Sequence, residues 1–110
     1  MAKLILLMIS LPMFSSLWQQ KPLPLEKRIT ITFYAAEILE SVANRVGLES
    51  RQTIIFNVQE LLPYKAKARV YNDVTVKDIL DDQLSGTPFK YRMNRKKQLE
   101  IYKPQGDGNN

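Results

Sequence analysis

The sequence predicts an α+β fold in which two βαβ-like units pack two helices on small β-sheets. Three observations predict it: short segments that alternate apolar and polar residues, two segments with apolar residues at helical spacing, and the order of these segments along the chain. The chain has 110 residues, of which 45% are hydrophobic and 25% charged. A chain of this length supports one hydrophobic core, so we expect one small domain.

The first unit begins with a strand and a helix. Residues 29–33 alternate with their apolar residues on one face, which predicts a half-buried strand. Apolar residues at helical spacing then predict a helix over 35–46, ended by Gly47. The β-branched run 53–57 predicts a short strand covered on both faces, and 58–62 predicts one helical turn.

The second unit repeats this order. Residues 65–70 alternate, which predicts another half-buried strand. Thr75 can cap a helix of similar apolar spacing, which ends at Gly86. Segments 89–93 and 99–102 alternate again and are joined by a polar, basic turn, which predicts a hairpin. We expect both helices to pack against one sheet. The residues expected to point inward from the strand over 65–70 are Ala66, Ala68 and Val70.

The first twenty residues have the layout of a secretory signal peptide. A short basic start precedes an apolar run over 4–14 and then a polar stretch. This run is too short for a spanning helix, which needs about twenty residues. A buried N-terminal helix is the alternative, and Pro12 disfavours it because proline breaks a helix. We therefore expect an exported chain with a signal peptide over 1–20, an extended lead-in over 21–25, a folded domain over 26–103 and a flexible tail over 104–110.

The residue types exclude several reaction classes. The chain has no Cys and no His, so it cannot form a thiol nucleophile, a Ser-His dyad or a common zinc site. Three carboxylates, Asp78, Asp81 and Asp82, fall on one predicted helix, but no second cluster nearby in sequence completes a metal or acid–base site. We interpret them as a solvated face. The sequence predicts no enzymatic activity, no cofactor and no metal.

Basic side chains on two predicted strands are the candidates for a partner-binding surface. The net charge of +5 suits a nucleic acid, an anionic membrane or an acidic protein equally well. A nucleic-acid surface is disfavoured because Tyr91 alternates to the opposite face from its basic neighbours, and because no RNP strand or GXXG loop is present. The basic residues also suit protection of exposed strands against pairing, and a partner could add a strand to an open edge. The candidates are Lys65, Lys67, Arg69, Lys90 and Arg92.

Three pieces of the segment 29–102 carry a family resemblance: 29–33 leading into 38–48, 55–57 with 60–62, and 74–91. The most specific is the last, a helix that runs into Gly-Thr and an aromatic strand. In this order the pieces resemble the short N-terminal domain, STN, of secretins and TonB-dependent outer-membrane receptors, in the receptor form found in Bacteroidetes. Gln83 departs from the pattern, because the family usually has an aliphatic residue there, and Pro88 stands where a glycine is more usual.

The resemblance implies a binding role without catalysis in the periplasm. In TonB-dependent transducers this domain engages the periplasmic part of a membrane-bound anti-sigma regulator when the receptor binds its ligand. In secretins the similar domain helps to assemble the ring and to meet partner proteins. For this chain the resemblance implies the first role, with a secretin-like assembly module as the alternative. We expect a monomer that reaches the outer membrane only through a receptor part absent from this sequence.

Overall fold

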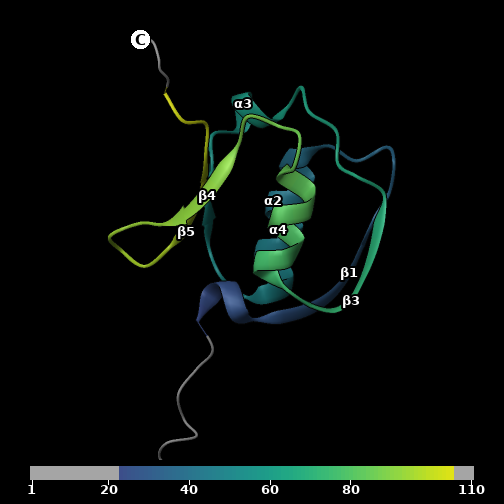
Figure 1. Ribbon diagram of the computed structural model, residues 1–110, viewed down its shortest axis with the longest axis horizontal. Helices are drawn as coiled ribbons and strands as arrows, with labels where there is room; N and C mark the ends of the chain where they lie inside the picture. The colour runs from purple at the N-terminus through teal and green to yellow at the C-terminus, as the bar shows by residue number, and fades with distance from the viewer. Residues whose placement is uncertain (1–22, 106–110) are drawn as a thin grey trace, which may run out of the picture.

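The computed structural model describes residues 23–105, which form a mixed α+β fold as predicted (Figure 1). The predicted signal peptide and residues 106–110 of the predicted tail lie outside the described residues. The elements in chain order are the short 3₁₀ helix η3 (Pro24–Glu26), β1 (Arg28–Phe33), α2 (Leu39–Ser50), β2 (Ile54–Ile55), α3 (Val58–Leu61), β3 (Arg69–Thr75), α4 (Val76–Leu84), β4 (Lys90–Met93) and β5 (Leu99–Tyr102).

The strands form two sheets and not the single sheet that we expected. β1 pairs with β3 in an antiparallel sheet, whereas β5 lies between a parallel β2 and an antiparallel β4. α2 and α4 pack together between the two sheets (Figure 1). Each unit therefore places its first strand in one sheet and its second strand in the other, which covers the helix pair on both sides. The predicted hairpin of β4 and β5 is confirmed.

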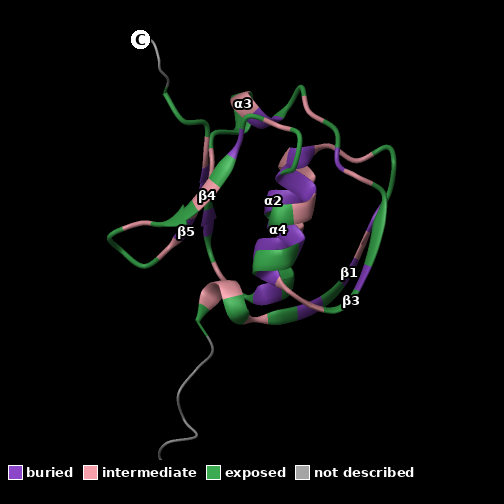
Figure 2. Cartoon of the chain, in the orientation of Figure 1, coloured by how far each residue is buried: buried purple, intermediate pink, exposed green. Residues whose placement is uncertain are grey.

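The hydrophobic core lies where the helices meet the two sheets (Figure 2). β1 buries Ile29, Ile31 and Phe33, the three apolar residues of the predicted strand. Ile79 and Leu80 of α4 are completely buried. Each such side chain stabilises the fold by about 1.5–3 kcal/mol.

The predicted start of the first helix is wrong: α2 begins at Leu39, later than the predicted range 35–46. The preceding segment is held in a different conformation. The main-chain N–H of Glu37 donates to the carbonyl of Tyr34 over 3.0 Å, and the Glu37 carbonyl accepts from the main chain of buried Ala66 over 2.9 Å. This segment cannot belong to the helix, because its backbone groups are hydrogen-bonded within a turn and to a distant segment of the chain.

The predicted stop at Gly47 is also wrong, because this glycine lies inside α2. A Cβ at Gly47 would lie 3.0 Å from the carbonyl oxygen of Gln52 and 3.6 Å from the Ile54 side chain. The glycine therefore permits close packing of α2 against the chain that follows. α2 ends at Ser50, and the cap is Arg51 in the left-handed conformation at φ 57°.

The predicted strand over 65–70 is displaced along the chain. β3 begins at Arg69, and Ala68 and Val70, which we expected to point inward, are exposed. Tyr71 is buried in their place because it pairs opposite Ile31 on the buried face of β1. A shift of one position exchanges the two faces of a strand. In β3 it is therefore Tyr71, and not Val70, that reaches the core.

The predicted strand over 53–57 shrinks to β2, and its two faces differ. Ile54 is buried, whereas Ile55 is 39% exposed, so the expectation of cover on both faces is wrong. The helical turn predicted next is confirmed as α3. The side chain of Asn57 caps it by accepting the main-chain N–H of Glu60 over 3.3 Å.

Candidate protein-binding surface

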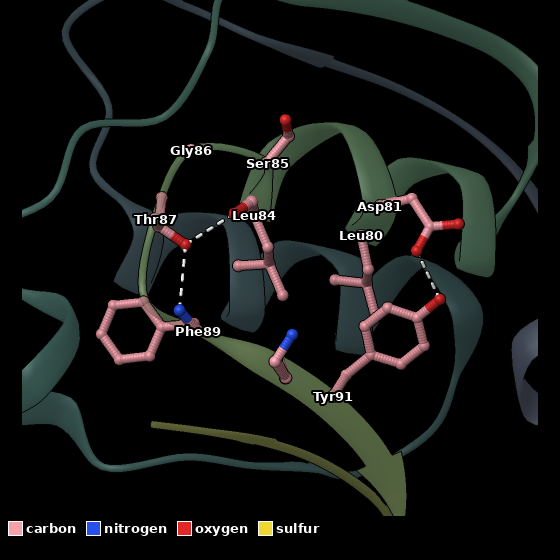
Figure 3. Close-up of a pocket in the computed structure, with 9 residues that line it drawn as sticks. Leu80, Asp81, Leu84, Ser85, Gly86, Thr87, Phe89 and Tyr91 are labelled. Carbon is pink, nitrogen blue, oxygen red and sulfur yellow. Dashed lines mark hydrogen bonds between the residues drawn. The ribbon is translucent and has the colours of Figure 1, made fainter. Parts of the chain in front are cut away.

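α4 and β4 frame an open groove on the surface (Figure 3). The predicted start of α4 is confirmed, because the Thr75 hydroxyl accepts the main-chain N–H of Asp78 over 3.1 Å. Gly86, at φ 83°, takes the left-handed conformation after the helix and returns the chain towards β4. The groove has a volume of about 430 Å³. Its lining combines Leu80, Leu84 and Phe89 with Asp81, Lys90 and Tyr91.

Two consecutive aspartates of α4 hold tyrosines from the two different sheets. The Tyr91 hydroxyl of β4 donates to Asp81 over 2.5 Å, and the Tyr71 hydroxyl of β3 donates to Asp82 over 2.6 Å. The bond from Tyr91 lowers the pKa of Asp81, with a further contribution from a lysine ammonium, although burial opposes the shift. The bond from Tyr71, with an arginine beside it, lowers the pKa of Asp82 in the same way.

These bonds refine the interpretation of the acidic residues as a solvated face: Asp78 and Asp81 are exposed, as expected, whereas Asp82 is half-buried. Asp81 and Asp82 tie α4 to both sheets, and they diverge from one another because their tyrosines lie in different sheets. Among the residues that the structure describes, no group of three acidic, His or Cys side chains could hold a metal ion. Asp81 and Asp82 therefore act as structural acceptors.

Gln83 has a structural role that the sequence did not reveal. Its side chain is completely buried. Its Oε1 accepts the main-chain N–H of Lys67 over 2.8 Å, and its Nε2 donates to the Lys67 carbonyl over 2.8 Å and to the Tyr71 hydroxyl over 3.0 Å. The amide thus pairs with the segment before β3 as a neighbouring strand would. Only the departure from an aliphatic residue could have indicated this role.

Two of the five basic candidates have intramolecular partners on α4. The Lys67 ammonium donates to the carbonyl of Ser85 over 2.6 Å and to that of Gln83 over 3.3 Å, at the C-terminal end of the helix. A cation is favourable there because it complements the helix dipole. Arg69 forms an ion pair of 2.9 Å with Asp82. Both residues therefore fasten the start of β3 to α4.

The other three candidates lie nearer to solvent. Arg92 pairs with Glu100 across the hairpin over 3.2 Å, and its guanidinium lies 4.1 Å from the ring centre of Tyr102. Lys65 and Lys90 are exposed, and neither makes an ion pair within residues 23–105. Lys90 also lines the groove. It is the candidate best placed to meet a partner.

No helix in the described part of the chain has the length and apolar character needed to cross a membrane. No protein-family model, curated protein or solved structure matches the chain. The STN family therefore stays a prediction from the residues quoted above.

Proposed function

We propose that the chain is a non-catalytic periplasmic signalling domain of the STN kind, which binds the periplasmic part of an anti-sigma regulator. One observation carries the proposal. The most specific piece of the resemblance, residues 74–91, forms one continuous unit of α4, the left-handed turn at Gly86 and the edge strand β4. That unit also frames the groove, so the residues of the resemblance and the available surface coincide.

The chemistry of the surface supports a protein partner over a small substrate. The carboxylate in the groove, Asp81, accepts a hydrogen bond from the Tyr91 hydroxyl and forms an ion pair of 2.9 Å with Lys77, so it already has intramolecular partners. The chain contains no His or Cys that could act beside it. What this surface offers is exposed basic charge at Lys90, the partly exposed side chain of Met93 and the main chain of an edge strand, all of which suit recognition of a polypeptide.

The predicted signal peptide leads us to include export in the proposal. A periplasmic address brings the domain to the regulator, and outer-membrane association follows only if a receptor part is joined to it. Detection of the protein in the periplasmic fraction is the expected result. Retention in the cytoplasm contradicts the proposal, because the regulator segment lies on the other side of the inner membrane.

Light scattering on the purified chain, alone and mixed with the periplasmic segment of a regulator encoded beside it, tests the proposed partner. We expect a monomer alone and a one-to-one complex in the mixture. A mixture that stays two separate species at high-micromolar concentration contradicts the proposal.

One observation favours the secretin-like alternative. Each strand of the β1–β3 sheet has an unpaired edge, and Val70 of β3 is 75% exposed. Open edges and exposed apolar side chains promote assembly between copies of a chain. A ring or higher oligomer in the absence of a partner therefore favours an assembly module, and a monomer favours the signalling domain.

A further inference from the structure

β4 is the outermost strand of its sheet, so the main chain along its outer edge is not paired with another strand. The N–H of Asn94 donates to the carbonyl of Gln98 over 2.9 Å, which identifies these two as a hydrogen-bonded pair of the hairpin. In an antiparallel hairpin such pairs alternate, so the next one joins Arg92 to β5. The N–H and carbonyl groups of Tyr91 and Met93 therefore point away from β5, towards the open edge.

The open edge borders the groove on its apolar side. Leu80 and Leu84 of α4 point into the space between the helix and β4, and Phe89 closes its end (Figure 3). Successive side chains of a strand point to opposite faces. Leu80, Leu84 and Phe89 are themselves buried, so every second side chain of a strand laid along β4 would lie beside the half-buried Tyr91 and the 37% exposed Met93, which share the face that meets α4.

The outer face of the same hairpin is strongly basic. Lys90 is exposed on β4, and the turn to β5 adds exposed Arg95, Lys96 and Lys97. None of these four makes an ion pair among the described residues, and the carboxylate of the hairpin, Glu100, is paired with Arg92. The remaining side chains of an added strand would meet this uncompensated positive charge.

The other strand edges are less suited to accept a strand. β2 has only two residues. In the β1–β3 pair the register shifts where Thr30 opposes both Asn72 and Asp73, and Asp73 has φ 57°. Such a bulge twists a strand and interrupts its pairing. The groove, the basic face and an edge strand without a bulge occur together at β4.

We propose that an extended segment of a partner protein, with alternating apolar and acidic side chains, adds to the open edge of β4 as a fourth strand of that sheet. Its apolar side chains pack beside Tyr91 and Met93, and its acidic side chains face Lys90 and the basic turn. A nucleic acid lacks the alternating N–H and carbonyl groups that the main chain of Tyr91 and Met93 requires. The identity of the partner as an anti-sigma regulator rests on the proposed function, whereas the site and its chemistry do not.

Amide hydrogen exchange on the ¹⁵N-labelled chain tests the site with a defined probe, a synthetic peptide of about ten residues in which valine and glutamate alternate. We expect the amides of Tyr91 and Met93 to exchange rapidly in the free protein and to be protected by the peptide. A peptide with lysine in place of glutamate should bind at least about tenfold more weakly. The same glutamate peptide, N-methylated at alternate residues to remove its pairing N–H groups, should not protect these amides.

Met93→Pro provides the matching change in the protein, because it removes an outward N–H and leaves the pairs with β5 intact. We expect it to abolish peptide binding, while Met93→Thr retains it, and protection of Leu99 in β5 shows that the sheet is still formed. Protection at the β1–β3 edge, equal binding of the basic peptide, preference for a single-stranded oligonucleotide, or protection by the N-methylated peptide overturns the inference. The N-methylated peptide is used with the wild-type protein, so it tests the inference even if Met93→Pro fails to fold.

The same pair of variants separates this inference from the proposed function. If the regulator segment binds wild-type and Met93→Pro protein equally, the regulator is the partner and the inferred site is wrong. If the glutamate peptide binds at β4 and the regulator segment does not bind, the site is right and the proposed partner is wrong.

Discussion

Replacement of Gln83 by leucine tests whether a buried amide fastens the start of β3 to α4. Leucine has a similar volume, so the substitution opens little cavity and chiefly removes hydrogen bonds. The N–H and the carbonyl of Lys67 each lose a partner at 2.8 Å, whereas the Tyr71 hydroxyl keeps its bond to Asp82. An unsatisfied buried group costs about 1–3 kcal/mol. Because Lys67 is half-buried and water reaches part of it, we expect Gln83→Leu to lower the free energy of unfolding by about 2–3 kcal/mol.

Urea unfolding followed by circular dichroism measures this loss as a lower midpoint at an unchanged slope. The matched control is Gln59→Leu, an exposed glutamine on α3, which should change the free energy of unfolding by less than about 0.5 kcal/mol. Hydrogen exchange adds a local measurement, since the Lys67 amide should lose its protection only in Gln83→Leu. If Gln83→Leu is as stable as the wild type, the amide contributes no net stability and the reasoning is refuted.

Three further predictions concern the C-terminal end of α2, the buried face of α4 and the loss of stability at low pH. Arg51→Gly should raise the free energy of unfolding by about 0.5–1 kcal/mol, because glycine adopts the left-handed conformation without strain; a lower urea midpoint contradicts this. Leu80→Ala should lower it by about 2–5 kcal/mol, because Leu80 is completely buried, and a loss below that range means that the site collapses around the smaller residue. The folded-state pKa values of Asp81 and Asp82 lie below their ordinary value of 3.8, so the stability that they contribute is present above that pH and is lost as the pH falls through the folded values. Thermal unfolding against pH should therefore show a fall below about pH 4 that is shallower in Asp82→Asn, and an identical fall in that variant rules out the contribution.

The elements that the sequence predicted well are those defined by signals close together in the chain. β1 follows from the alternation of Ile29, Ile31 and Phe33, and the start of α4 follows from a threonine three residues before Asp78. The β4–β5 hairpin follows from two alternating segments and a polar turn. In each case the residues that decide the structure lie within one turn or one strand of each other.

The errors occur where contacts between distant residues decide the backbone. The start of α2 is moved by the bond between Glu37 and Ala66, and the register of β3 by the pairing of Tyr71 with Ile31. Neither contact leaves a local signal, because the partners are far apart in the sequence. The same cause explains why Lys67 has an intramolecular role that no strand pattern indicates.

The candidate surface was predicted in part. The exposure of Lys90 and the basic character of the hairpin could be read from alternation alone. The groove could not, because it depends on α4 lying beside β4, and no local signal indicates the bond from Tyr91 to Asp81 that joins these elements. Which strand edge is open also required the topology.

A nuclear magnetic resonance titration of the ¹⁵N-labelled chain with the regulator's periplasmic segment tests the central claim, that this is a partner-binding domain, most directly. We expect saturable shifts at one-to-one stoichiometry, concentrated in the amides of β4 and of the C-terminal half of α4. An absence of shifts at every residue up to high-micromolar concentration would contradict it.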